Sequence, residues 1–108
     1  MMHERVLSID YDHPSLAGHF PGHPVVPGVV LLNEVLETLR HGSATSLVVT
    51  GLPMVKFSSP LRPGEVVKIH VDEEEAGQAT FSCQGDARLI ASGAIEFTPG
   101  TNAPAERV

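Results

Sequence analysis

Residues 19–28 read His19-Phe20-Pro21-Gly22-His23-Pro24-Val25-Val26-Pro27-Gly28. The stretch holds three prolines and two glycines. Proline fixes φ at about −65° and glycine frees it, so the path of this loop is largely set by its own sequence. A strongly apolar segment follows at once. The stretch therefore predicts a stiff loop that holds His19 against the N-terminus of a helix, which is an arrangement suited to catalysis.

The apolar segment predicts a helix from Gly28 to about Arg40. Its apolar side chains recur with the period of a helix that has one apolar face. They are Leu32, Val35, Leu36 and Leu39. Because residues 29–32 are all apolar, we expect the helix to be buried on most sides at its start. Gly42 is suited to the left-handed conformation that often follows a last helical turn.

After this helix the hydrophobic pattern changes to a period of two. Alternation and turn residues predict strands over residues 5–10, 46–57, 65–73, 78–84 and 87–97, with the second strand interrupted near residues 51–53. Val67, Ile69 and Val71 should face one side, and His70 should face solvent. This order describes an α+β domain in which an antiparallel sheet wraps around one helix. We expect a single domain over residues 1–98 and a flexible tail over residues 99–108.

Composition excludes several classes of function. The chain has 108 residues, which fits one domain, and its formal charge of −6 argues against nucleic-acid binding. The one cysteine, Cys83, excludes an internal disulfide and a cysteine-rich zinc site, and we expect it to be a small buried residue. No apolar run reaches the length of a membrane span, and no signal-type core follows the first residues. We therefore expect a cytoplasmic protein that binds neither nucleic acid nor membrane.

Residues 18–29 closely resemble the β-hydroxyacyl-ACP dehydratases of fatty-acid synthesis, the FabA/FabZ-like group. Residues 55–57 and 60–65 resemble that family's next strand and turn, and residues 85–97 resemble its final hairpin. The resemblance implies a hotdog fold and a homodimer or higher even oligomer, with acyl tunnels at the interface between two chains. It implies a 3-hydroxyacyl substrate on the phosphopantetheine of an acyl carrier protein, with a trans-2-enoyl thioester and water as products. It implies no metal and no separate cofactor.

The resemblance also implies roles for individual residues. His19 matches the histidine that removes the α-proton, and Gly28 matches the glycine whose N–H binds the thioester carbonyl. Histidine has a pKa near neutrality, and an N–H in the first turn of a helix can stabilise growing negative charge. The expected substrate-binding residues are Phe20, Pro27, Val29 and Phe57. The candidates for docking the acidic carrier protein are Lys56, Arg62 and Arg88.

The chain departs from the family at the catalytic carboxylate, which lies fourteen residues after the histidine. Asn33 stands at that position. An asparagine can orient a leaving hydroxyl or a water, but it cannot supply a proton. The neighbouring Glu34 is expected nearly opposite the apolar stripe, and hence solvated, because a helix turns about 100° per residue. Dehydration would then use His19 as base and afterwards as acid, or would use His23 as an assistant.

Two other functions stay open. The first is a thioesterase of the same fold, in which a carboxylate activates water, and this would require Glu34 to point inward. The second is a non-catalytic acyl-thioester-binding chain or a partner in a heteromeric dehydratase, and Asn33 favours it.

Overall fold

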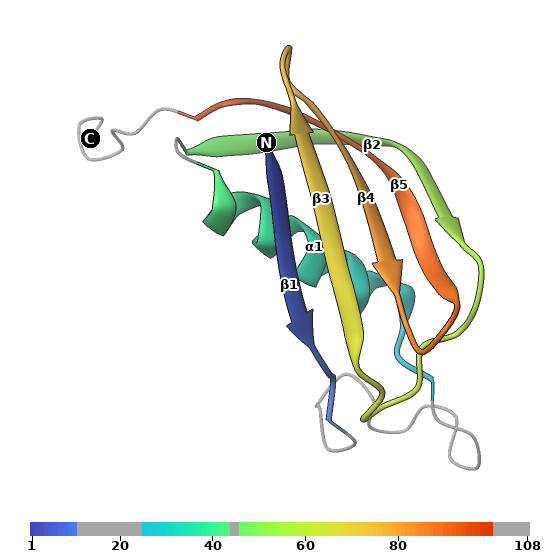
Figure 1. The fold of residues 1–108 in the computed structure, drawn as a ribbon. Coiled ribbons are helices and arrows are strands. Elements are labelled where there is room, and N and C mark those ends of the chain that lie inside the picture. The colour runs from blue at the N-terminus through green and yellow to red at the C-terminus, as the bar shows by residue number, and fades with distance from the viewer. Residues whose placement is uncertain (11–24, 44–45, 101–108) are drawn as a thin grey trace.

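The computed structural model describes residues 1–10, 25–43 and 46–100. Within these residues the chain forms five strands and one helix (Figure 1), namely β1 (Met2–Leu7), α1 (Gly28–Gly42), β2 (Leu47–Phe57), β3 (Val67–Glu74), β4 (Gln78–Gln84) and β5 (Leu89–Pro99). All five strands belong to one antiparallel sheet in the order β1-β3-β4-β5-β2. β1 and β2 are therefore its two edges.

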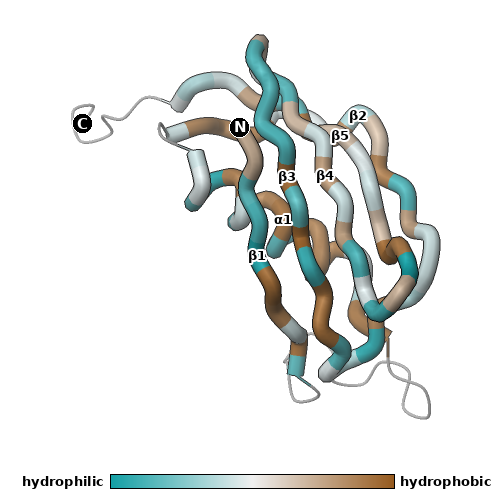
Figure 2. Tube along the Cα trace, viewed as in Figure 1, coloured by the Kyte–Doolittle hydropathy of each residue, from teal (hydrophilic) through white to brown (hydrophobic). Residues whose placement is uncertain are grey.

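The sheet curls around α1, which contacts β1 and β3 (Figure 1). Apolar and polar residues alternate along β3 in Figure 2, and the apolar set of that strand is fully buried. The largest side chains that are completely buried come from the helix and the inner face of the sheet: Val35, Leu39, Val67, Ile69, Val71, Cys83, Ile90 and Ile95. The expected α+β hotdog architecture is confirmed.

Several predicted elements are confirmed in detail. β4 has the predicted bounds, Gln78–Gln84. β2 runs as one strand to Phe57, but its pairing with β5 shifts register between Val49 and Met54, where the sequence predicted an interruption. Cys83 is buried, and burial raises the pKa of its thiol to about 12. No helix in the described segments is long and apolar enough to cross a membrane.

The prediction for the first strand is wrong by three residues. β1 spans Met2–Leu7, and Ile9 is buried beyond its end. The polar side chains of β1 find partners on neighbouring elements, which is why a polar sequence can form this strand. His70 is one of these partners, with its Nδ1 2.8 Å from Glu4 Oε2. The His70 side chain is 31% exposed, so it faces solvent in part while it contacts Glu4 across the sheet.

Gly42 does not adopt the left-handed conformation predicted for it. α1 continues through Gly42, and the chain leaves the helix at Ser43, whose φ is −73°. A Cβ at position 42 would overlap the ring of His3 on β1. Glycine is therefore needed here for the close approach of β1 to the helix.

The far end of the sheet extends slightly beyond the predicted domain boundary. β5 includes Pro99, and the Gly100 N–H donates to the Ser46 carbonyl over 2.9 Å. Residues 101–108, the remainder of the predicted tail, lie outside the described residues.

Candidate active site

A cavity of about 350 Å³ lies between the start of α1, the end of β2 and the loop that follows β2. Most of its lining is apolar, and its side-chain hydroxyls come from Ser58 and Ser59. The lining residues are Val25, Val26, Gly28, Leu31, Phe57, Ser58, Ser59, Pro60, Leu61 and Ile90. The cavity thus joins two residues expected in the site, Gly28 and Phe57, which are far apart in sequence.

Gly28 is the first residue of α1 and sits against this cavity. Pro27 precedes it with φ −60° and ψ 141°, and no side chain caps the helix. The first N–H groups of a helix have no partner within it, and they lie at the positive end of its dipole. A Cβ on residue 28 would come within 2.6 Å of the Phe57 ring, so the aromatic ring packs directly over the glycine. The helix start can therefore present a backbone donor beside an apolar surface.

The other residues expected in the site are placed less centrally or lie outside the described part. His19, Phe20 and His23 fall within residues 11–24, which the structure does not describe. Val29 is 72% exposed, and neither Val29 nor Pro27 is part of the cavity lining. Their predicted contact with substrate stays a prediction.

The sequence did not predict that Ser58, Ser59 and Ile90 line the cavity. Ser58 and Ser59 both donate backbone N–H groups to the Ile90 carbonyl, over 2.8 and 3.3 Å. This link brings the loop after β2 to the start of β5. The resemblance of residues 60–65 to the family's turn predicted a turn here, but nothing in those residues specifies which strand the turn packs against.

The buried face of α1 is rotated from the one predicted. Its buried residues are Leu31, Val35, Thr38 and Leu39, whereas Leu32 and Leu36 are only partly buried. Because a helix turns about 100° per residue, this rotation moves Glu34 from the opposite side to the flank of the buried face. It also moves Asn33 to the side facing away from the sheet, where it is exposed in this chain.

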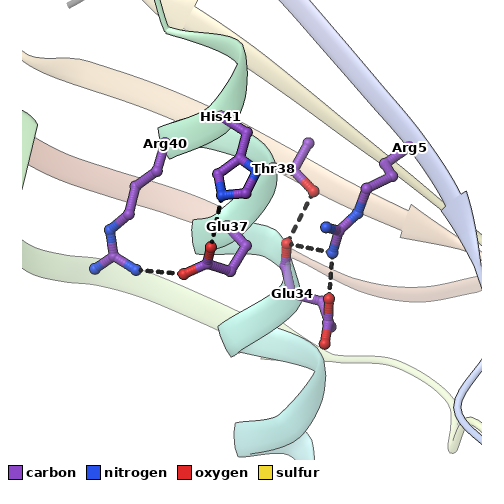
Figure 3. A network of polar contacts seen from close by, with 6 residues as sticks. All are labelled: Arg5, Glu34, Glu37, Thr38, Arg40 and His41. Carbon is purple, nitrogen blue, oxygen red and sulfur yellow. Dashed lines mark hydrogen bonds and ion pairs between the residues drawn. The ribbon is translucent and has the colours of Figure 1, made fainter. Parts of the chain in front are cut away.

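Glu34 is consequently not a solvated side chain, and that prediction is wrong. Its side chain is 27% exposed, and its carboxylate forms an ion pair with Arg5 on β1 (Figure 3). The Glu34 carbonyl accepts hydrogen bonds from Arg5 Nη2 over 3.2 Å and from Thr38 Oγ1 over 2.8 Å. Glu34 does not line the cavity. Its carboxylate therefore ties α1 to the edge strand.

The three basic residues considered for docking differ in their surroundings. Lys56 and Arg62 are exposed. Arg88 is partly buried and forms an ion pair with Glu65 over 2.6 Å. The hydrogen bond from Arg88 holds the pKa of the Glu65 carboxyl below its usual range, and the same bond raises the pKa of Arg88. The charge of Arg88 is thus already engaged within the chain.

The described residues were also searched for groups that could hold a metal ion. Among residues 1–10, 25–43 and 46–100, no cluster of three or more histidine, cysteine, aspartate or glutamate side chains could hold a metal ion.

Comparison with known proteins places the chain in a family. The ApeI-like family, described as ApeI dehydratase, matches residues 2–94. The chain belongs to the ApeI-like dehydratase family. It is 30% identical over 97 residues to a 3-hydroxyacyl-[acyl-carrier-protein] dehydratase, FabZ, from Gluconobacter oxydans. That match covers 78% of this chain and 55% of the relative, so this ApeI-like chain spans about half the length of the curated protein.

Solved structures agree with the family. The dehydratase heterocomplex ApeI:P from Xenorhabdus doucetiae contains a chain with a TM-score of 0.78 and 28% identity, with 88% of this chain and 87% of that chain covered. An acyl-CoA hydrolase mutant from Staphylococcus aureus has a TM-score of 0.70 at 15% identity, covering 94% of this chain and 67% of that one. At that identity the hydrolase shows only that the fold is shared.

Proposed function

We propose that this chain dehydrates a 3-hydroxyacyl thioester, carried by an acyl carrier protein, to a trans-2-enoyl thioester and water. The observation that carries the proposal is the apolar cavity at the N-terminus of α1, with Gly28 in its lining, in a member of a dehydratase family. An acyl chain fits the apolar wall. The thioester carbonyl would then lie beside the backbone donor at the helix start.

The proposed chemistry uses one base and one backbone donor. Neutral His19 accepts the α-proton, and the electrons of that C–H bond move toward the thioester carbonyl. The Gly28 N–H and the helix dipole stabilise the resulting enolate-like oxygen. The electrons then return to form the α,β double bond, and the C–O bond at the β-carbon breaks. The proton on His19 passes to the departing hydroxyl, which leaves as water.

In this proposal Asn33 occupies the position of the family's catalytic carboxylate but has no acidic proton to donate. Its amide can hold the β-hydroxyl by hydrogen bonding, so the histidine carries the proton in both directions. Asn33 is exposed on the side of α1 that faces away from the sheet, so its amide is accessible to a second chain. We propose that two chains, either two copies of this chain or one copy and a related partner, complete the site together.

The proposal is tested with a 3-hydroxyacyl thioester on carrier protein, followed by the absorbance of the enoyl product. Wild-type protein should form the enoyl thioester, and His19→Ala should abolish its formation. Glu34→Ala should retain catalysis because its carboxylate pairs with Arg5 rather than lining the cavity. Activity retained in the histidine variant would overturn the mechanism. Increased activity in Asn33→Glu would show that the missing acid limits the rate.

A heteromeric dehydratase is the second candidate, and Asn33 favours it. One of the similar structures is itself described as a dehydratase heterocomplex. If this chain binds acyl thioesters but forms no enoyl product alone, adding a family member that carries the carboxylate should restore dehydration. Release of free thiol from a saturated acyl thioester would instead indicate a hydrolase. The engagement of Glu34 by Arg5 argues against that outcome.

A further inference from the structure

A forked ion pair lies behind the loop that forms one wall of the cavity. Arg88 Nη2 lies 2.7 Å from Glu65 Oε1, and Arg88 Nη1 lies 2.6 Å from Glu65 Oε2. The glutamate side chain is 15% exposed and the arginine 33%. Two parallel contacts between a guanidinium and a carboxylate fix the relative orientation of the two groups, which a single contact does not.

The same two side chains also hold backbone groups of the loop. Arg88 Nη2 donates to the Pro60 carbonyl over 2.8 Å, and the Arg62 N–H donates to Glu65 Oε1 over 3.2 Å. On the other side, the Asp86 N–H lies 3.4 Å from Glu65 Oε2. The pair therefore joins the loop after β2 to the turn between β4 and β5.

From this loop the hydrogen bonds continue to the start of α1. The Leu61 carbonyl, next to Pro60, accepts the Val26 N–H over 2.8 Å. Val26 is 5% exposed, lines the cavity and precedes Gly28 by two residues. An uninterrupted path of short contacts thus runs from Arg88 through the loop to the segment that positions the helix N-terminus.

We propose that Glu65 and Arg88 are a positioning pair that sets the shape of the acyl cavity and thereby the affinity for the acyl thioester. Neither residue touches the reacting atoms. The proposal rests on the proposed function of the cavity, because it assigns the acyl group to it. It predicts that losing the pair weakens substrate binding while the chemical step proceeds at its normal rate once substrate is bound.

Arg88→Met removes the fork and keeps most of the side-chain volume. The Glu65 carboxylate and the Pro60 carbonyl then lose a charged donor. We expect KM for the thioester to rise about tenfold, with kcat within about twofold of wild type. Hydrogen exchange at the Val26, Ser58 and Ser59 amides should become faster. Arg88→Lys offers one point charge in place of the two-pronged guanidinium contact. Its KM should therefore lie between those of wild type and Arg88→Met.

The matched control is Arg40→Met, which breaks an exposed ion pair with Glu37 near the other end of α1. It should change neither KM nor the three exchange rates. Glu65→Gln tests the other half of the pair, and adding it to Arg88→Met should raise KM little further, because both changes break one interaction. The proposal is overturned if Arg88→Met matches the control, or if its kcat and melting temperature fall while KM is unchanged.

Failure of the proposed function can be distinguished from failure of this inference. If wild-type protein forms no enoyl product, the affinity for a saturated acyl thioester and the amide exchange rates still report on the cavity. Weaker binding with faster exchange in Arg88→Met, but not in Arg40→Met, supports the positioning role without any turnover. Unchanged binding and exchange overturn it even when the wild type is active.

Discussion

At the scale of single residues, Asn33 and Glu34 show what a sequence can and cannot predict about this site. Counting fourteen residues from His19 finds the position of the missing acid without any structure. The surroundings of Glu34 could not be predicted, because they depend on the burial of Thr38, a polar residue. Thr38 enters the core because its hydroxyl is satisfied within the helix by the Glu34 carbonyl. That burial turns Glu34 toward β1.

The Arg5–Glu34 pair is expected to stabilise the fold without contributing to catalysis. Glu34→Ala leaves the partly buried guanidinium of Arg5 with only the Glu34 carbonyl as a partner on α1. We expect the free energy of unfolding to fall by about 1–2 kcal/mol, measured by urea denaturation, while kcat/KM stays within about twofold of wild type. Glu37→Ala is the control, since Glu37 pairs with Arg40 and His41 in more exposed contacts (Figure 3). Equal stability of the two variants would contradict this role.

At the scale of elements, the sequence predicts best those strands whose neighbours in the sheet show the same alternation of apolar and polar residues. β3 and β4 alternate cleanly and are joined by a short turn. The predicted bounds of β4 are therefore those observed, and the predicted bounds of β3 lie within two residues of those observed. The position of β1 could not be predicted in this way, because its polar side chains find hydrogen-bond and ion-pair partners only across the sheet and on the helix. The end of α1 was missed for a related reason. Gly42 is there for the close approach of His3, and that contact joins segments 39 residues apart in sequence.

Gly93 on β5 is expected to be the glycine least tolerant of a side chain in the sheet. A Cβ at this position would overlap the Met54 carbonyl on β2 and come within 2.8 Å of the Phe81 ring. The carbonyl belongs to paired backbone and cannot move without disturbing the β2–β5 ladder. Gly93→Ala should therefore cost more than about 3 kcal/mol of unfolding free energy, or prevent folding, as measured by denaturation and circular dichroism.

Gly51→Ala provides the comparison for Gly93→Ala within the same pair of strands. Its Cβ would meet only the end of the Glu96 side chain, at 3.1 Å, and that side chain can move aside. We expect a change within about 1 kcal/mol, because alanine in a strand also restricts the unfolded chain. Similar losses in the two variants would show that the steric account of Gly93 is incorrect.

At the scale of the whole molecule, the two edges of the sheet differ in how they are protected. β1 carries His3, Glu4 and Arg5, whereas β2 is uncharged from Leu47 to Val55. Val48 and Met54 on β2 are 54% and 57% exposed. Charged side chains discourage pairing at an exposed edge, and an apolar edge favours it. The resemblance of the sequence to a dehydratase family predicted a partner chain. Which edge of the sheet would bind that partner could not be predicted until the strand order was known.

The oligomer is therefore expected to form through β2. The double variant Val48→Lys/Met54→Lys places two charges in the expected interface. Both positions are exposed, so the buried core is not disturbed. The dimer dissociation constant should rise at least about tenfold, measured by sedimentation equilibrium, since burying unpaired charges is costly. Val6→Lys is the matched control, because Val6 is 62% exposed on the opposite edge. If Val6→Lys dissociates the protein and the β2 variant does not, the chains pair through β1.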